Sequence, residues 1–387
     1  MNLFLTGATG FLGGELLITL SKRNDIKKIY CLVRAKSEEE ANKRLKHVFD
    51  LHNDIYQPEK IIPILANLLD DDLKVKLSAY KELDDINLIV HSAANTSFSK
   101  NCDDQVKKVN INGLEHVLTW AKELKNLETF CYIGTATICG KDNKDKIIKE
   151  EESPNTLAHH LVTYTYTKMM GEMMLDKFLP QEKILVVRPS IIMGDSVNAI
   201  PRSSVILWTL AAFNYLRLIP VNKHSKIDII PVDYAANAIT ELLFVKNRSY
   251  SVYHVSAGVD SATDSELCCQ KIESYFPDKP SHAFVQRKVA NNMRFWAKGR
   301  MEDIGDLANY PNHLDYWESI LTEKGRLRIL FAGLEPYFDF IELGQVFDNT
   351  RLLQDITLPK PLPAHEYILN NIKFLESIDI YEGAIDP

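Results

Sequence analysis

The sequence predicts an α/β fold in which a doubly wound parallel sheet carries a smaller, mostly helical lobe in the C-terminal part. Over roughly the first half of the chain, short apolar runs alternate with longer helical patterns. Several runs are apolar throughout, which is typical of strands buried on both faces of a parallel sheet. The first run leads directly into a glycine-rich turn and a helix, as at the start of a βαβ unit.

The alternation can be followed element by element. Strands are expected at residues 2–6, 28–33, 61–65, 87–91, 129–133 and 183–188. Helices are expected between them, at residues 11–22, 38–49, 105–124 and 163–178. Such an order gives a Rossmann-type sheet, whose ligands bind at the carboxyl ends of the strands.

The rhythm changes after about residue 194. A long apolar helix at 204–216 is followed by a strand at 226–230, a helix at 234–245 and a strand at 251–255. From about residue 262 onward, helical patterns interrupted by prolines dominate. We therefore expect a first domain at 1–200, to which 226–258 returns, and a substrate-binding lobe formed by 201–225 and 259–387.

The composition argues against two classes of function. The 387 residues carry a net charge of −7, which argues against a large basic surface for nucleic acid. The longest apolar stretch, 205–213, is shorter than the about 20 residues that a transmembrane helix needs, although contact with a lipid surface stays open. The six cysteines have no CxxC spacing and no signal-peptide pattern is found, so we expect free thiols, no metal site and a cytoplasmic protein.

A glycine-rich segment, TGATGFLG at residues 6–13, follows the first strand and opens the first helix. Its three glycines permit a tight turn and a close approach of the backbone to a pyrophosphate. The helix offers its unpaired N–H groups and the positive end of its dipole to that anion. We expect the contacts with a dinucleotide to come from Gly7, Thr9, Gly10, Phe11, Leu12 and Gly13.

The end of the second strand indicates which dinucleotide binds. About 20 residues after the glycine turn, NAD-binding chains usually carry an acidic residue that holds the ribose 2′-hydroxyl. This chain has Val33-Arg34-Ala35-Lys36 at that place. A guanidinium makes paired, charge-assisted hydrogen bonds to a phosphate, whereas a carboxylate would repel it. We therefore expect NADP(H), with Arg34 on the 2′-phosphate, and an NADP-binding domain at 1–200.

Residues at the ends of the third and fourth strands support the same site. Asn67 and Leu68 follow the third strand, and Ala93 and Ala94 follow the fourth. Small side chains at these strand ends let a flat ring and a ribose lie against the backbone. Because the carboxyl ends of parallel strands meet at one edge of the sheet, all four residues are expected to contact the cofactor.

A proton-transfer pair is expected where the fourth predicted helix opens. Tyr164 and Lys168 are four residues apart, so they lie on one face of that helix. A nearby ammonium favours the phenolate, so we expect the pKa of Tyr164 to be lowered from its usual value of about 10. Tyr166 is the competing phenol but has no lysine four residues on. At the end of the fifth strand, Thr135 can donate to a substrate oxygen, and Thr137 is the alternative hydroxyl.

Taken together, these segments resemble the extended short-chain dehydrogenase/reductase superfamily and, within it, the branch of fatty acyl-CoA reductases and thioester reductases. The likeness covers roughly residues 1–258. It is carried by TGATGFLG at 6–13, LVRA at 32–35, HSAA at 91–94, VNING at 109–113, Tyr164 with Lys168, VRPSIIMG at 187–194 and DIIPVDY at 228–234.

This resemblance implies catalysis by Thr135, Tyr164 and Lys168. Two positions depart from the family's pattern. Gly134 stands where the family often has serine, so the hydroxyl role falls on Thr135 alone, and Ala66-Asn67 stand where Gly-Asp is frequent, at the adenine contact. The resemblance also implies further cofactor contacts, which come from Asn110, Tyr164, Lys168, Pro189, Ser190, Ile191 and Ile192.

The activity that the resemblance implies is NADPH-dependent reduction of an acyl thioester, carried by CoA or by a carrier protein in trans, to an aldehyde or on to an alcohol, as part of lipid metabolism. Hydride transfer puts charge on the carbonyl oxygen, which Thr135 and Tyr164 stabilise by hydrogen bonds. No cysteine is placed to form an acyl-enzyme.

Two other functions stay open. An NADP-dependent carbonyl or hydroxysteroid-type dehydrogenase would use the same residues on a ketone, and a non-catalytic NADP-sensing protein would share the fold. A sugar-nucleotide epimerase is disfavoured because such enzymes usually keep NAD and lack an arginine at position 34. The apolar helix pattern at 205–218 either lines a groove for an acyl chain or forms ordinary core.

Overall fold

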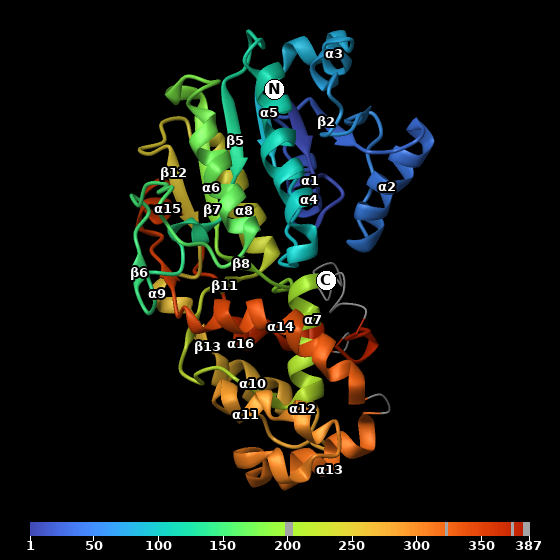
Figure 1. Ribbon diagram of the computed structural model, residues 1–387. Helices are drawn as coiled ribbons and strands as arrows, with labels where there is room; N and C mark the ends of the chain where they lie inside the picture. The colour runs from blue at the N-terminus through green and yellow to red at the C-terminus, as the bar shows by residue number, and fades with distance from the viewer. Residues whose placement is uncertain (198–203, 322–323, 373–374, 382–387) are drawn as a thin grey trace.

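The computed structural model describes residues 1–197, 204–321, 324–372 and 375–381, and its centre is a sheet of seven parallel strands (Figure 1). The strands are β1 (Asn2–Thr6), β2 (Lys28–Val33), β3 (Ile61–Leu65), β4 (Leu88–His91), β5 (Thr129–Ile133), β7 (Ile184–Pro189) and β12 (Val252–Val255). Their order is β12-β7-β5-β4-β1-β2-β3. The chain therefore winds outward in two directions, and the topological switch point lies between β1 and β4.

The doubly wound parallel sheet is thus confirmed. The strands predicted at 2–6, 28–33, 61–65 and 129–133 have the observed bounds. Those predicted at 87–91 and 251–255 begin one residue later, and the one predicted at 183–188 is shifted by one residue to 184–189. Side chains alternate between the two faces, since Leu3 and Leu5 of β1 belong to one hydrophobic cluster and Phe4 to another. Burial on both faces explains why Leu3, Phe4 and Leu5 form a continuous apolar run.

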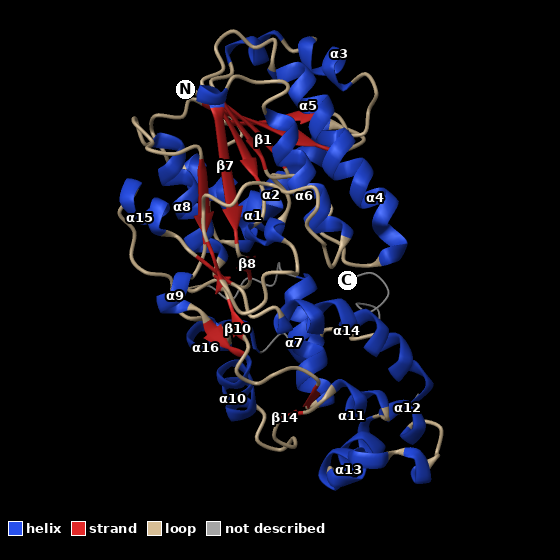
Figure 2. Cartoon of the chain, turned by 60° about the vertical axis from the view of Figure 1, so that its left-hand side comes forward, coloured by secondary structure: helices blue, strands red, loops and turns tan. Residues whose placement is uncertain are grey.

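Helices cover both faces of the sheet (Figures 1 and 2). The side chains of Leu3 and Leu5 share their cluster with α1 (Phe11–Ser21), α2 (Glu38–Leu51) and α8 (Val232–Phe244). Phe4 shares its cluster with α3 (Leu73–Ser78), α5 (Gly113–Ala121) and α6 (Thr163–Leu175). Figure 2 shows the strands directed toward the helical lobe, so their carboxyl ends meet the boundary between the two parts.

The helix predicted at 105–124 is interrupted. The structure has α4 (Asp103–Lys107), then one π-helical turn at Lys108–Asn112, and then α5. Such turns insert an extra residue into a helix and are frequent at functional sites. Here the turn directs Asn110 toward α6, where its amide donates to the hydroxyl of Thr167 at 2.9 Å.

The prediction of one continuous strand at 226–230 is wrong, because the strand is interrupted at Asp228. The carboxylate of this buried residue accepts hydrogen bonds from the backbone N–H groups of Ala257 at 2.7 Å and Phe347 at 2.9 Å. These bonds join three loops at one point and divide the segment between two small sheets. The pairs are β10 (Lys226–Ile227) with β13 (Thr263–Asp264), and β11 (Ile229–Ile230) with β8 (Ile191–Ile192).

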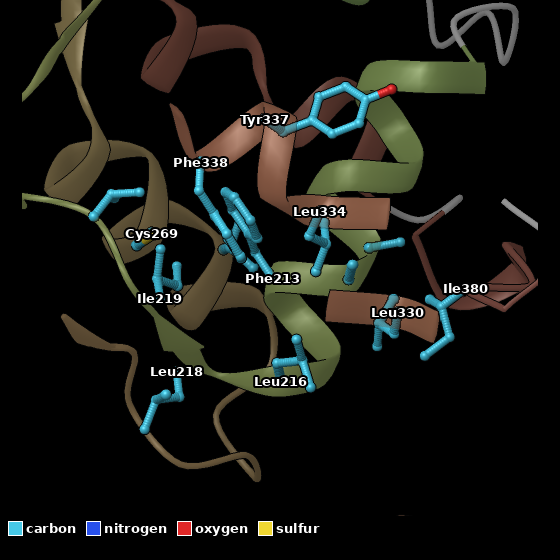
Figure 3. Packing of buried hydrophobic residues seen from close by; sticks show 14 of the residues in the cluster. Phe213, Leu216, Leu218, Ile219, Cys269, Leu330, Leu334, Tyr337, Phe338 and Ile380 are labelled. Atoms are coloured by element: carbon cyan, nitrogen blue, oxygen red, sulfur yellow. The ribbon is translucent and has the colours of Figure 1, made fainter. Parts of the chain in front are cut away.

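The second part of the chain forms a mostly helical lobe beneath the carboxyl ends of the strands (Figure 1). Its helices share one hydrophobic cluster, to which α7 (Ser204–Leu216) contributes Trp208 and Phe213. Figure 3 shows the rings of Phe213 and Phe338 side by side in this cluster, with their centroids 5.7 Å apart and their planes 9° apart. Phe213 of α7 therefore packs against α14 (Leu327–Glu342) in the interior of the lobe.

The remaining elements of the lobe are short apart from three helices. They are β9 (Leu218–Ile219), α9 (Gly258–Ser261), α10 (Ser265–Tyr275), β14 (Ala283–Phe284), α11 (Arg287–Asn291), α12 (Met293–Trp296), α13 (Pro311–Ile320), α14 (Leu327–Glu342), α16 (Ala364–Tyr367) and α17 (Leu369–Ile372). None of the helices in the described ranges is long and apolar enough to cross a membrane.

A late segment of the chain returns to the sheet domain. β15 (Val346–Phe347) pairs with β6 (Ile147–Ile148), and α15 (Thr350–Asp355) places Leu352 in the cluster that contains Leu3 and Leu5. Part of 259–387 thus lies against the sheet. The predicted division into domains stays a prediction, and its boundary at residue 200 lies outside the described residues.

Candidate active site

A cavity of about 650 Å³ lies at the carboxyl ends of the central strands, on both sides of the switch point. A cavity of this size is typical of small-molecule and cofactor sites, and this position is where doubly wound sheets bind their ligands. The cavity is lined by residues at or just after the carboxyl ends of β1 to β5 and of β7. These include Gly7, Arg34, Asn67, Ala93, Thr135 and Pro189.

The glycine loop lines the cavity with the six residues expected from the sequence, Gly7, Thr9, Gly10, Phe11, Leu12 and Gly13. Gly7 has a φ of +76°, and a Cβ there would lie 2.8 Å from the backbone nitrogen of Ala93. A Cβ at Gly13 would lie 2.1 Å from the carbonyl oxygen of Gly7. Side chains at either position would fill the cradle where α1 begins, so the loop fits an anion held by backbone N–H groups.

Two guanidinium groups stand at the end of β2. Arg34 is exposed and lines the cavity, as does Arg44, which lies ten residues later on α2. Arg44 donates hydrogen bonds to the backbone carbonyl of Arg34 and, at 3.3 Å, to the hydroxyl of Thr9. Arg44 was not among the cofactor residues predicted from the sequence. It could have been suspected because it lies three residues after Ala41, next to the face of α2 that packs on the sheet.

The turn after β3 is held by its own polar groups. The side-chain oxygen of Asn67 accepts from the N–H of Leu69 at 3.1 Å, and the N–H of Asn67 donates to the carboxylate of Asp70 at 2.9 Å. Both Asn67 and Leu68 line the cavity. This turn is therefore shaped before any ligand binds.

A buried network fixes the segment after β4. The N–H of Ala93 donates to the hydroxyl of Thr6 at 3.2 Å, and that hydroxyl lies 3.1 Å from Nδ1 of His91. Burial, with the Lys168 ammonium nearby, lowers the pKa of His91 to about 3. The neutral imidazole can then accept the hydroxyl proton of Thr6 at Nδ1. Ala93 and Ala94 both line the cavity.

Asn110 is the one expected cofactor residue that does not line the cavity. Its side-chain oxygen accepts from the N–H of Asn95 at 2.8 Å, and its amide nitrogen donates to the carbonyl of Asn95 and the hydroxyl of Thr167, both at 2.9 Å. Because this amide is buried and engaged, Asn110 holds the loop after β4 against α6. Val109 lines the cavity in its place.

The proton-transfer residues meet at one wall of the cavity. Tyr164 and Lys168 on α6 both line it, and so do Thr135 and Thr137. The hydroxyls of the two threonines are 2.9 Å apart. Nζ of Lys168 donates to the carbonyl of Ile133 at 2.6 Å, which anchors the ammonium at the end of β5.

The structure separates the two candidate phenols. Tyr166 is 37% exposed and does not line the cavity. Tyr164 faces the cavity, and its ring stacks on Phe98 with the centroids 6.2 Å apart. Helical rotation of 200° between positions two residues apart on α6 accounts for the difference.

The expected lowering of the Tyr164 pKa is not found. Burial raises the pKa of Tyr164 to about 12 and lowers the pKa of Lys168 to about 7. Desolvation disfavours the phenolate and the ammonium alike, because each would be a charge removed from water. At neutral pH Tyr164 is therefore a neutral phenol, which donates a hydrogen bond.

The turn after β7 closes the cavity on the side of the lobe. Pro189, Ser190, Ile191 and Ile192 all line it. The N–H of Ser190 donates to the carbonyl of Val255 at 3.0 Å, and Ile191 and Ile192 form β8, which pairs with β11. The turn is thus tied to both neighbouring segments.

Comparisons with known proteins agree with this site. An NAD-binding family model described as male sterility protein matches residues 5–239. A putative fatty acyl-CoA reductase of Drosophila melanogaster is 27% identical over 340 residues, which cover 76% of this chain and 62% of that protein. Fatty acyl-CoA reductase 2 of Mus musculus is 28% identical over 302 residues, or 66% of this chain and 58% of that protein. The chain thus spans about three fifths of the length of these curated relatives.

A solved structure shares the fold. The terminal R domain of the myxalamid PKS-NRPS biosynthetic pathway superposes with a TM-score of 0.71 at 20% identity, covering 97% of this chain and 90% of that one. The NAD-binding family model, the glycine cradle and the position of the cavity agree on a nicotinamide dinucleotide as the cofactor.

Proposed function

The chain belongs to the male sterility protein family, and from that premise we propose that it reduces an acyl thioester with NADPH. Relatives in this family carry the name fatty acyl-CoA reductase. The observation that carries the proposal is the arrangement of the cavity. Two arginines stand at one end, and Thr135, Tyr164 and Lys168 meet at another wall.

The choice of NADPH over NADH rests on the charge around the end of β2. Arg34 and Arg44 both line the cavity, and none of the described residues that line it carries a carboxylate. A 2′-phosphate would meet two guanidinium groups with no acidic side chain to repel it. The pyrophosphate would lie at the N-terminus of α1.

Bound NADPH supplies a hydride to the carbonyl carbon of the thioester. The chain's own residues act on the carbonyl oxygen, where negative charge develops. The hydroxyls of Thr135 and Tyr164 would donate to this oxygen and stabilise the charge. Thr137 accepts from or donates to Thr135 at 2.9 Å and so orients that hydroxyl.

Tyr164 would then transfer its phenolic proton to the oxygen, because a neutral phenol is its state at pH 7. Lys168 lies one helical turn away with a pKa of about 7, so it can return a proton to the phenolate. The resulting hemithioacetal would then collapse: its C–S bond breaks, its hydroxyl proton passes to the sulfur, and the thiol and the aldehyde are released. None of the six cysteines is among the described residues that line the cavity, so the reduction is direct and forms no acyl-enzyme.

The test is NADPH oxidation with a panel of acyl-CoA and acyl-carrier-protein thioesters, together with ketones. Tyr164→Phe should lower kcat by about 10²- to 10⁴-fold, because one positioned acid is lost. NADPH binding should be kept, and Tyr166→Phe is the matched control because Tyr166 lies outside the cavity. Wild-type turnover retained by Tyr164→Phe would refute the assignment.

The same panel resolves the finer points. Turnover of ketones without thioesters would favour the carbonyl or hydroxysteroid-type dehydrogenase, and NADPH binding without any turnover would favour a sensing protein. One NADPH consumed per thiol released indicates the aldehyde, and two indicate the alcohol. The cysteines are free, which suits the reducing cytoplasm as the proposed location.

A further inference from the structure

A second cavity lies inside the helical lobe. It measures about 100 Å³, which is several times the roughly 10–15 Å³ that one water needs on the same measure. Its walls are almost wholly apolar, and a cavity of that kind stays dry and accepts apolar ligands. The walls come from α7, α10, α14 and the short strands between them, and include Leu210, Phe213, Ile219, Cys268, Cys269 and Ile272.

This apolar cavity adjoins the candidate active site. Phe98, Ile191 and Phe340 line both cavities. The ring of Phe98 stacks on Tyr164 at 6.2 Å between centroids and on Tyr337 at 5.0 Å. It also lies 5.3 Å from the ring of Phe340. A group held at the Tyr164 hydroxyl therefore has an apolar wall beside it that leads into the lobe.

We propose that the apolar cavity receives the alkyl chain of the thioester and that α10 sets the length of chain that fits. This inference rests on the proposed reduction of a thioester. The carbonyl group would lie at Tyr164, the chain would pass Phe98 and Phe340, and its methyl end would reach Cys269 and Ile272.

The occupant is an unbranched alkyl chain because of the chemistry of the walls. The surface that the walls expose to the cavity is almost wholly apolar, so a polar group on the chain would lose most of its hydration. Figure 3 shows the hydroxyl of Tyr337 directed away from Cys269. Aromatic rings at the mouth would also enclose a narrow chain more closely than a branched one.

The α10 wall of the cavity is formed by buried side chains. Cys269 and Ile272 are buried on α10, one turn apart, and Ile219 lies beside Cys269 in Figure 3. Protein cores of this kind are close-packed and yield little to an added group. A chain longer than the cavity would therefore have to displace α10 or leave methylenes outside.

The test compares kcat/KM for butyryl-, octanoyl-, dodecanoyl- and palmitoyl-CoA. Each methylene buried in the cavity should raise kcat/KM about fourfold until the cavity is full. Cys269→Phe puts a ring into the cavity at the α10 wall, so the ratio of dodecanoyl to butyryl turnover should fall about tenfold or more, as two or more methylenes are excluded. Ile272→Ala lengthens the cavity, and the preferred chain should become longer. Cys102→Phe, at a half-buried cysteine outside both cavities, is the matched control.

A binding measurement separates this inference from the proposed function. Calorimetric titration with dodecyl-CoA thioether, which cannot be reduced, should show weaker binding to Cys269→Phe and not to the Cys102→Phe control. Thioether binding with this pattern but no thioester turnover overturns the proposed reduction alone. Turnover whose chain-length profile is the same in wild type, Cys269→Phe and Ile272→Ala overturns the inference alone. If one of these variants does not fold, the other decides.

Discussion

Removal of the two guanidinium groups at the end of β2 tests how the cavity distinguishes the two nicotinamide dinucleotides. Arg34 is exposed at the cavity wall, whereas Arg44 is half-buried and already donates to the Arg34 carbonyl and to Thr9. Arg34→Ala removes one donor group with little effect on the loop. Arg44→Ala removes a second donor group and two contacts that hold the loop in place.

The size of the effect follows from the strength of charge-assisted hydrogen bonds. Each contributes about 1.5–3 kcal/mol, or about 10- to 150-fold in Kd. The exposed Arg34 should lie at the lower end of this range because water competes for the phosphate. Arg44→Ala should raise the Kd of NADPH more than Arg34→Ala does. It should also raise the Kd of NADH a few-fold, because the glycine loop loses two of its contacts. The double variant should lose less NADPH binding free energy than the sum of the losses in the two single variants, because the two residues are in direct contact.

The assay is fluorescence titration of NADPH and NADH at several salt concentrations. Wild type should prefer NADPH, and the preference should weaken as salt rises. Lys43→Ala is the matched control, since Lys43 is exposed on the same helix but does not line the cavity. The reasoning fails if Arg34→Ala weakens NADPH and NADH by the same factor, or if wild type prefers NADH.

Two further predictions concern buried charges. Burial lowers the pKa of Lys168 to about 7, so between pH 7 and about 10 the unfolded state binds more protons than the folded state. The free energy of unfolding should therefore rise with pH by up to about 1.4 kcal/mol per pH unit. Urea melts of wild type and Lys168→Met should diverge over this window, and parallel curves contradict the prediction. Asp228→Ala leaves the N–H groups of Ala257 and Phe347 without their acceptor, which should cost about 2–5 kcal/mol of unfolding free energy, measurable in the same melts with the exposed Asp306→Ala as control.

Features that depend on neighbours along the chain could be predicted from the sequence. The strands at 2–6 and 28–33 have their predicted bounds because the residues buried on both faces of a sheet form a continuous apolar run that can be recognised in the sequence. The glycine loop could be recognised because its turn and its helix N-terminus are made by consecutive residues. Arg34 could be placed for the same reason, since the end of a strand fixes where the next side chain stands.

Features that depend on packing could not be predicted from the sequence. Arg44 is near Thr9 only because α2 folds back over the glycine loop, and the motif around Asn110 gave no sign that its amide would bind Asn95. The spacing to Lys168 favoured Tyr164 over Tyr166, but only the orientation of α6 against the sheet shows that Tyr164 faces the cavity. The pKa of Tyr164 is raised and not lowered as expected, because the spacing indicates a nearby ammonium but does not show that the phenol loses its contact with water.

The sequence by itself thus determined the order of strands and helices, the glycine cradle and the residues that can transfer a proton, since each is written in short-range pattern. Only the tertiary structure decided which faces lose water, which side chains meet across distant segments, and how an apolar cavity in the lobe adjoins the candidate catalytic wall. The physical reason is that desolvation and packing depend on distances between residues far apart in the chain, such as Phe98, Ile272 and Phe340, and a one-dimensional pattern contains no such distances.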